Sequence, residues 1–173
     1  MGKWTIRCDG GTNAELILPG EDPDHLRIEI RGAEPKTQFD VQLNQPRLNL
    51  KKNDLYILRF RGRAAAVRAL CFGAAQAHAP WQNLGLYREI ELTPQWADFE
   101  EKWTPTDDEF NARIHFDAGQ ASVPFELAGV RLTRLKPGTT EAVLVEPGEH
   151  SGTGDQLWQS QPSAPADSPP PPA

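Results

Sequence analysis

The sequence predicts an all-β protein built from antiparallel sheets. Apolar and polar residues alternate with period two in about ten short segments, and clusters of Gly, Pro, Asn and Asp separate these segments. In no stretch of helical length do the apolar residues form one helical face. Many short strands with this spacing are typical of a sandwich or a barrel.

The predicted strands follow one another closely along the chain. Alternation begins at Trp4, and the turn sequence Asp9-Gly10-Gly11 separates the first strand from the second. The third and fourth strands alternate Leu, Ile, Phe or Val with charged and polar residues. We expect strands at 4–8, 14–18, 26–31, 39–44, 55–63, 67–72, 86–92, 96–103, 112–118 and 125–135, with 143–145 as a further candidate.

This pattern predicts one β-sandwich domain over residues 1–135 and an extended, acidic, Pro-rich tail or linker over 136–173. From residue 160 the tail is Pro, Ser and Ala with little else, so it lacks the apolar surface that would offset its ordering entropy. We expect it to be disordered or polyproline II. A plain linker, a ligand for a Pro-binding domain and a tether to a fused or partner protein all stay open.

Charge and composition limit the classes of partner. The net charge is −6, of which the tail supplies −4, so the body is close to neutral and is not expected to bind nucleic acid. The longest apolar run is too short for a membrane span, and the N-terminus lacks the apolar core of a signal peptide. We expect a cytoplasmic protein as written, or a secreted one if the chain is a module from a larger protein. Cys8 and Cys71 are expected as buried thiols, with a single bridge left open.

Six segments carry a family resemblance through their order and spacing. They are FDVQLNQ at 39–45 with Leu48, DLYILRF at 54–60, VRAL at 67–70, IELTPQW at 90–96, ARIHFDAG at 112–119 and VRL at 130–132. Together they resemble a carbohydrate-binding module of the family 4/9/16/22 type, over residues 4–135.

The resemblance implies a galactose-binding-like jelly-roll sandwich that binds a polysaccharide or oligosaccharide, without catalysis, in a groove on the concave sheet. Arg68 stands where family members have a groove arginine, and Arg113 and Asp117 stand at polar positions of a neighbouring groove strand. His115 lies between the last two. Trp81 and Tyr87 lie in or just after the loop that presents an aromatic ring.

Two positions depart from the family. Ala128-Gly129 replaces an acidic pair that often helps to hold a structural calcium, so no metal or other cofactor is expected. Phe39 replaces the usual tryptophan at the start of its strand.

The side chains themselves suit a sugar, because an aromatic ring can stack on a pyranose and planar polar groups can match pairs of hydroxyls. Alternation predicts that Val67, Ala69 and Cys71 point inward, which leaves Arg68, Leu70 and Phe72 on the groove face. The candidate site residues are Gln42, Asn44, Arg68, Trp81, Tyr87, Arg113, His115 and Asp117.

Other interpretations of these residues stay open. Arg68 is equally compatible with a surface ion pair, Arg113 and Asp117 with a salt bridge on one face, and His115 with a hydrogen-bonded surface position. The protein as a whole is also compatible with a protein-interaction module on the same fold.

A third hypothesis is a glycoside hydrolase or lyase that uses Glu89 and Glu91, which would lie about 7 Å apart on one strand face. A Glu-x-Glu pair is more typical of a solvated strand edge. The four histidines lack metal-binding spacing, and the acidic loop 21–24 is compatible with calcium or with a simple turn.

Overall fold

The structure, a computed structural model, describes residues 4–20, 24–32 and 34–148. This part of the chain forms eleven strands and one short 3-10 turn, Gln38–Asp40. The strands are β1 (Thr5–Cys8), β2 (Thr12–Ile17), β3 (His25–Gly32), β4 (Val41–Leu50), β5 (Leu55–Ala64), β6 (Arg68–Gln76), β7 (Asn83–Leu92), β8 (Ala97–Trp103), β9 (Glu109–Asp117), β10 (Phe125–Leu135) and β11 (Ala142–Leu144). The predicted all-β class is confirmed. Among the described residues, no helix has the length and apolar character needed to cross a membrane.

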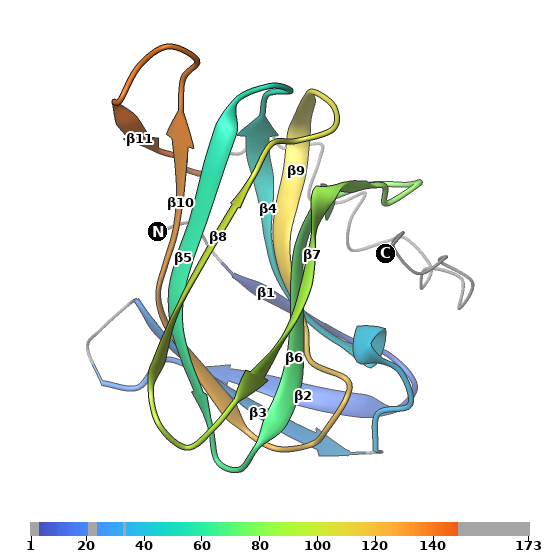
Figure 1. Cartoon of the computed structure of the whole chain (residues 1–173). Helices are drawn as coiled ribbons and strands as arrows, with labels where there is room; N and C mark the ends of the chain where they lie inside the picture. Colours follow the sequence, from blue (N-terminus) through green and yellow to red (C-terminus); the bar gives the residue numbers. More distant parts are fainter. Residues whose placement is uncertain (1–3, 21–23, 33, 149–173) are drawn as a thin grey trace.

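The strands form two antiparallel sheets that pack face to face (Figure 1). Sheet A has the order β1-β4-β9-β6-β7, and sheet B has the order β2-β3-β10-β5-β8, with β11 paired to β10. From β3 to β10 every connection except β6–β7 passes from one sheet to the other. This repeated crossing produces the predicted jelly-roll sandwich.

The core lies between the sheets because each strand turns its apolar alternates inward. Phe60 of β5 meets Phe72 of β6 and Phe116 of β9 edge to face, with ring centroids 5.2 Å and 5.1 Å apart. Such pairs add roughly 0.5–1.5 kcal/mol to their area burial. They join sheet B to two strands of sheet A, and so fix how these strands face the core.

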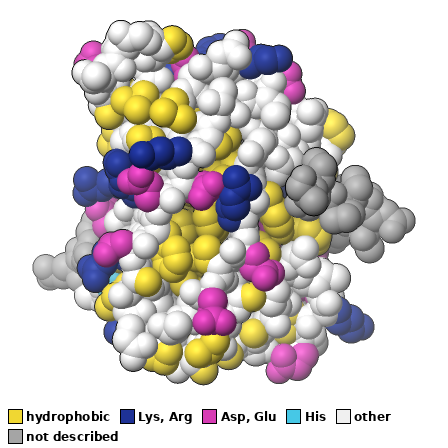
Figure 2. Space-filling view, viewed as in Figure 1, with side chains coloured by type: hydrophobic (Ala, Val, Ile, Leu, Met, Phe, Trp, Pro, Cys, Tyr) yellow, Lys and Arg dark blue, Asp and Glu magenta, His cyan; other side chains and the backbone are white. Residues whose placement is uncertain are grey.

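Side chains fill the space between β7 and β8, the edge strands of the two sheets (Figure 2). Apolar side chains gather at the middle of this face, over the gap between the two strands, with charged side chains around them (Figure 2). Arg88 Nε of β7 donates to Glu101 Oε1 of β8 at 2.9 Å, so an ion pair crosses the gap.

Strand β4 differs from its predicted bounds at both ends. Its predicted first residues form the 3-10 turn, because Asp40 accepts hydrogen bonds from the backbone N–H groups of Lys36 and Thr37. The strand then continues to Leu50 past an irregularity between Gln45 and Leu48, where Arg47 has a φ of 65°. A left-handed residue is typical of a bulge, which allows the strand to pass Pro46.

The segment 142–148, which we call the strap, links the two sheets. Its first part is β11, and Val145 N donates to Leu132 O of β10 at 2.8 Å. The last residue of the strap contacts the other sheet, because Gly148 N donates to Arg47 O of β4 at 3.0 Å. The strap therefore packs residues of the predicted tail against both sheets. Residues 160–173, the part of the tail predicted to be disordered or polyproline II, lie outside the described residues.

Both cysteines are free thiols in this structure, with Cys71 buried and Cys8 half-buried. Burial is the main cause that raises the pKa of each thiol.

Candidate functional site

A group of buried polar side chains lies on the outer face of sheet A. In β4 and β9 the apolar alternates Leu43, Ile114 and Phe116 point into the core. The residues between them must then point away from the core, because successive side chains of a strand alternate between faces. These residues are Gln42, Asn44, Arg113, His115 and Asp117, all of which were predicted.

The register of the sheet brings these side chains together. Gln42 pairs with Asp117, and Asn44 pairs with His115, across two strands that are far apart in the sequence. On the other side of β9, His115 pairs with Gly73 of β6, which in turn pairs with Tyr87 of β7. Six of the predicted residues, with Tyr87 among them, therefore occupy one continuous surface, which we call the polar floor.

Asp117 is the centre of the polar floor and is fully buried. Its Oδ1 accepts a hydrogen bond from Gln42 Nε2 at 2.8 Å and lies 3.0 Å from His115 Nδ1. Its Oδ2 accepts a hydrogen bond from the Tyr87 hydroxyl at 2.9 Å. One carboxylate thus fixes the orientation of three neighbouring side chains from three strands.

The electrostatics agree with an ionised Asp117. Burial acts to raise the pKa of this carboxyl, but His115, Gln42 and Tyr87 outweigh it and hold the pKa below its ordinary value. Burial and the neighbouring Asp117 raise the pKa of the Tyr87 phenol. Tyr87 is therefore a neutral hydrogen-bond donor at any ordinary pH.

Arg113 and Trp81 form the second part of the site. Arg113 Nη1 donates to Asn44 Oδ1 at 2.8 Å, and the guanidinium carbon lies 5.4 Å from the centroid of the Trp81 ring. Arg113 is only 6% exposed, and burial lowers its pKa to about 10. Its Nε is buried and has no hydrogen-bond partner among the described residues. The Nε–H group is thus a buried donor that no described residue satisfies.

Trp81 reaches Arg113 from the loop between β6 and β7. Its φ of 64° lies in the left-handed region, which is uncommon for a bulky residue. The side chain is half-buried, so part of the ring lies against Arg113 and part is accessible.

Gly73 allows the two rings of the polar floor to approach each other. A Cβ at this position would lie 2.7 Å from Leu86 O, 2.9 Å from Tyr87 Cδ2 and 3.0 Å from His115 Nε2. The missing side chain lets the Tyr87 and His115 rings approach to 5.9 Å between centroids. The sequence signal for this position is a glycine inside a strand, which often marks a close approach.

The structure separates Arg68 from the other predicted site residues, and the facing predicted for residues 67–72 is wrong. Leu70 and Phe72 belong to the core, whereas Val67 is 60% exposed and Cys71 lies on the outer face of sheet A. Arg68 therefore points toward the inside and is 3% exposed.

The Arg68 guanidinium serves the chain itself. It donates to the carbonyl oxygens of Ala118, Ala121 and Val123 at 2.5, 3.1 and 2.6 Å, and it lies 4.9 Å from the Phe125 ring centroid. Burial lowers its pKa to about 10. These contacts leave Arg68 no part in a groove on the outer face of sheet A.

The structure also locates the residues of the other hypotheses. Glu89 and Glu91 are exposed on β7, the last strand of sheet A. Among the described residues the largest exposed apolar side chain is Phe110, and the others are Leu18, Leu55 and Val67, with Val143 and Leu144 together on β11. Of the acidic loop 21–24, only Asp24 is described, and no three His, Cys, Asp or Glu side chains of residues 4–20, 24–32 and 34–148 gather as metal ligands.

The sequence matches no protein-family model and no curated protein. Solved structures do match. A CBM4 carbohydrate-binding module is 24% identical, with a TM-score of 0.65 over 76% of this chain and 86% of the module. The N-terminal cellulose-binding domain of Cellulomonas fimi β-1,4-glucanase C is 18% identical, with a TM-score of 0.58 over 75% of this chain and 86% of that domain.

A family 11 carbohydrate-binding module from Clostridium thermocellum, in complex with a β-1,3-1,4-mixed-linked tetrasaccharide, is 13% identical, with a TM-score of 0.53 over 75% of this chain and 87% of the module. The fold is that of the jelly-roll carbohydrate-binding modules. The resemblance predicted from the sequence is confirmed at the level of the fold, and each match covers nearly the whole of a module.

Proposed function

We propose that this protein is a carbohydrate-binding module that binds an uncharged glycan chain on the outer face of sheet A, without catalysis. The observation that carries the proposal is the buried Arg113 Nε, a donor with no partner among the described residues, beside the half-buried indole of Trp81. A buried donor without an acceptor costs roughly 1–3 kcal/mol. A sugar hydroxyl at this position would relieve that cost while the indole stacks on the sugar ring.

The residues have different roles in this proposal. Trp81 supplies the stacking surface, and Arg113 supplies the directional hydrogen bond. Asp117 is a positioning residue, because its two oxygens already hold Gln42, His115 and Tyr87. The His115 and Tyr87 rings lie next to each other at the side of the floor and would contact the next sugar unit.

The names of the similar structures suggest which glycans to test first. One is a cellulose-binding domain, and another was solved with a mixed-linked β-1,3-1,4 tetrasaccharide. A β-linked glucan is therefore the first probe, with xylan and mannan as comparisons.

The test is native gel electrophoresis in gels that contain soluble mixed-linkage β-glucan, xylan or mannan. We expect retardation in at least one gel, and Trp81→Ala should weaken binding by about tenfold or more, as for a buried aromatic anchor. Trp96→Ala is the matched control, because this indole lies at sheet B, against Arg61 and Arg63. No retardation in any gel, or equal losses in the two variants, would contradict the proposal.

A further inference from the structure

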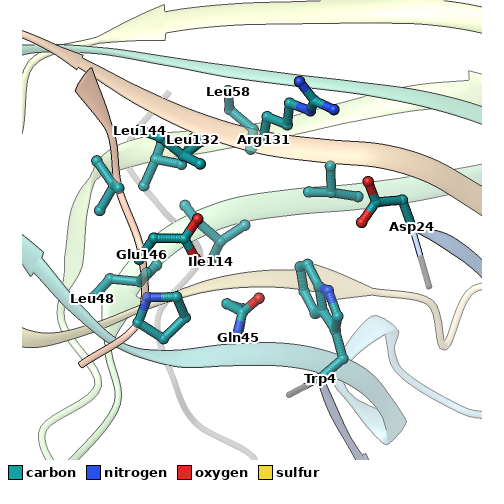
Figure 3. Close-up of a pocket in the computed structure, with 13 residues that line it drawn as sticks. Trp4, Asp24, Gln45, Leu48, Leu58, Ile114, Arg131, Leu132, Leu144 and Glu146 are labelled. Carbon is teal, nitrogen blue, oxygen red and sulfur yellow. The ribbon is translucent and has the colours of Figure 1, made fainter. Parts of the chain in front are cut away.

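A cavity of about 240 Å³ lies between the two sheets, on the side where the strap crosses from β10 to β4 (Figure 3). Its apolar wall includes Leu48, Leu58, Ile114, Leu132, Leu144 and Val145. An engineered apolar cavity of about 150 Å³ already binds benzene. This cavity therefore has room for an organic molecule with a substituted six-membered ring.

Two buried side-chain donors, neither with an acceptor among the described residues, line the same cavity. Trp4 and Gln45 are 8% and 6% exposed, and Figure 3 shows them on one side of the cavity, across from Leu132 and Leu144. Trp4 Nε1 and Gln45 Nε2 are both buried, and neither has a hydrogen-bond acceptor among the described residues. Buried donors are almost always satisfied in folded proteins. Two such donors beside one cavity point to an acceptor that occupies it.

The charges around the cavity limit what this acceptor can be. Two carboxylates, Asp24 and Glu146, and one guanidinium, Arg131, border the cavity (Figure 3), so the net negative charge disfavours an anion. The two unpartnered N–H groups in turn need an acceptor, which a simple cation does not supply. An uncharged molecule with an acceptor oxygen meets both conditions, and the mainly apolar wall favours an aliphatic body.

We propose that this cavity is a second binding site, which takes a neutral, mainly aliphatic molecule carrying one acceptor oxygen, such as a cyclic ketone or alcohol. The oxygen accepts hydrogen bonds from Trp4 Nε1 and from the amide of Gln45, whose terminal torsion is free to adjust. The body of the molecule lies under the strap, between Leu132 and Ile114. The site is independent of the polar floor, because Gln45 and Gln42 point to opposite faces of β4.

The test is a titration of the whole ¹⁵N-labelled chain with cyclohexanone, followed by the indole signal of Trp4 and the side-chain amide signal of Gln45. We expect both signals to shift and to saturate at millimolar concentration, while the Trp96 indole signal stays unchanged. Hexanoate, a probe of similar size with a negative charge, should bind about tenfold more weakly or not at all.

Two variants of the same strand separate this site from the polar floor. Gln45→Met keeps the length of the side chain but removes the donor, so cyclohexanone binding should weaken by about fivefold, as for one lost hydrogen bond. Gln42→Met, on the opposite face, should leave cyclohexanone binding unchanged. The proposal is overturned if the Trp4 signal does not respond in the unaltered protein, which would leave only water in the cavity, or if both variants weaken binding equally.

Discussion

Replacing Arg68 tests whether this buried arginine stabilises the fold or binds a ligand. The change is Arg68→Met, which keeps the apolar length of the side chain and removes the guanidinium. In the structure this group holds the segment 118–123 against the end of β6 through three carbonyl oxygens. Without it these carbonyls lose their donor, whereas the outer face of sheet A loses nothing.

The expected loss of stability follows from the number of carbonyls. Each buried acceptor left without a partner costs roughly 1–3 kcal/mol, so three of them set an upper range of about 3–9 kcal/mol. Water that enters the loop and the relief of a desolvated cation reduce this range. We expect the free energy of unfolding to fall by about 3–5 kcal/mol, a large part of the roughly 5–15 kcal/mol that stabilises a typical domain.

The assay is urea unfolding followed by tryptophan fluorescence, with the midpoint and the m value compared with those of the unaltered protein. Arg59→Met is the matched control, because Arg59 lies on β5 in an exposed ion pair with Glu100 and should cost at most about 1 kcal/mol. The reasoning is refuted if Arg68→Met costs less than its control. It is also refuted if the variant keeps full stability but loses glucan binding, since Arg68 would then be a binding residue.

Two further predictions concern the polar floor. Gly73→Ala should lower stability by about 1–3 kcal/mol, because the new Cβ would lie only 2.7 Å from the backbone oxygen of Leu86 in the paired strand; an unchanged melting temperature would contradict this. The pKa of Asp117 is lower in the folded protein than its ordinary value of 3.8, so the stability it contributes is complete above that value and is lost as the pH falls through the folded pKa. Asp117→Asn should therefore flatten the decline of the urea midpoint between neutral pH and acid, and an unaltered decline would show that Asp117 does not cause it.

Much of the fold was predictable because the alternation in most strands is clear. The segments 26–31 and 112–118 each have apolar residues on one face only, so their strands and facing follow from the sequence. Segment 67–72 has apolar residues at both parities, and the single arginine then suggested an outward face. In the structure Leu70 and Phe72 face the core because they fill more of it than Val67 and Ala69 would. Arg68 can face the same way because nearby carbonyl oxygens accept its hydrogen bonds.

The candidate site was predictable only in part. Alternation placed Arg113, His115 and Asp117 on one face, but it gave no information about which strand lies beside them. That β4 adjoins β9, and that Tyr87 reaches Asp117 across β6, depends on the topology of the whole sheet. The approach of Trp81 to Arg113 depends on the conformation of a loop, which no periodic pattern encodes.

The strap also covers backbone groups of β4 and β10 that another chain could otherwise pair with. Without the strap, β1 would cover only the first part of β4 and β3 only the first part of β10, so the rest of each strand would have one side without a partner strand. Bare backbone groups of this kind are templates for pairing with another chain. By engaging Leu132, Leu135 and Arg47, the strap occupies both strands within one molecule. A fragment that ended at residue 135 would leave both strands open to a second copy.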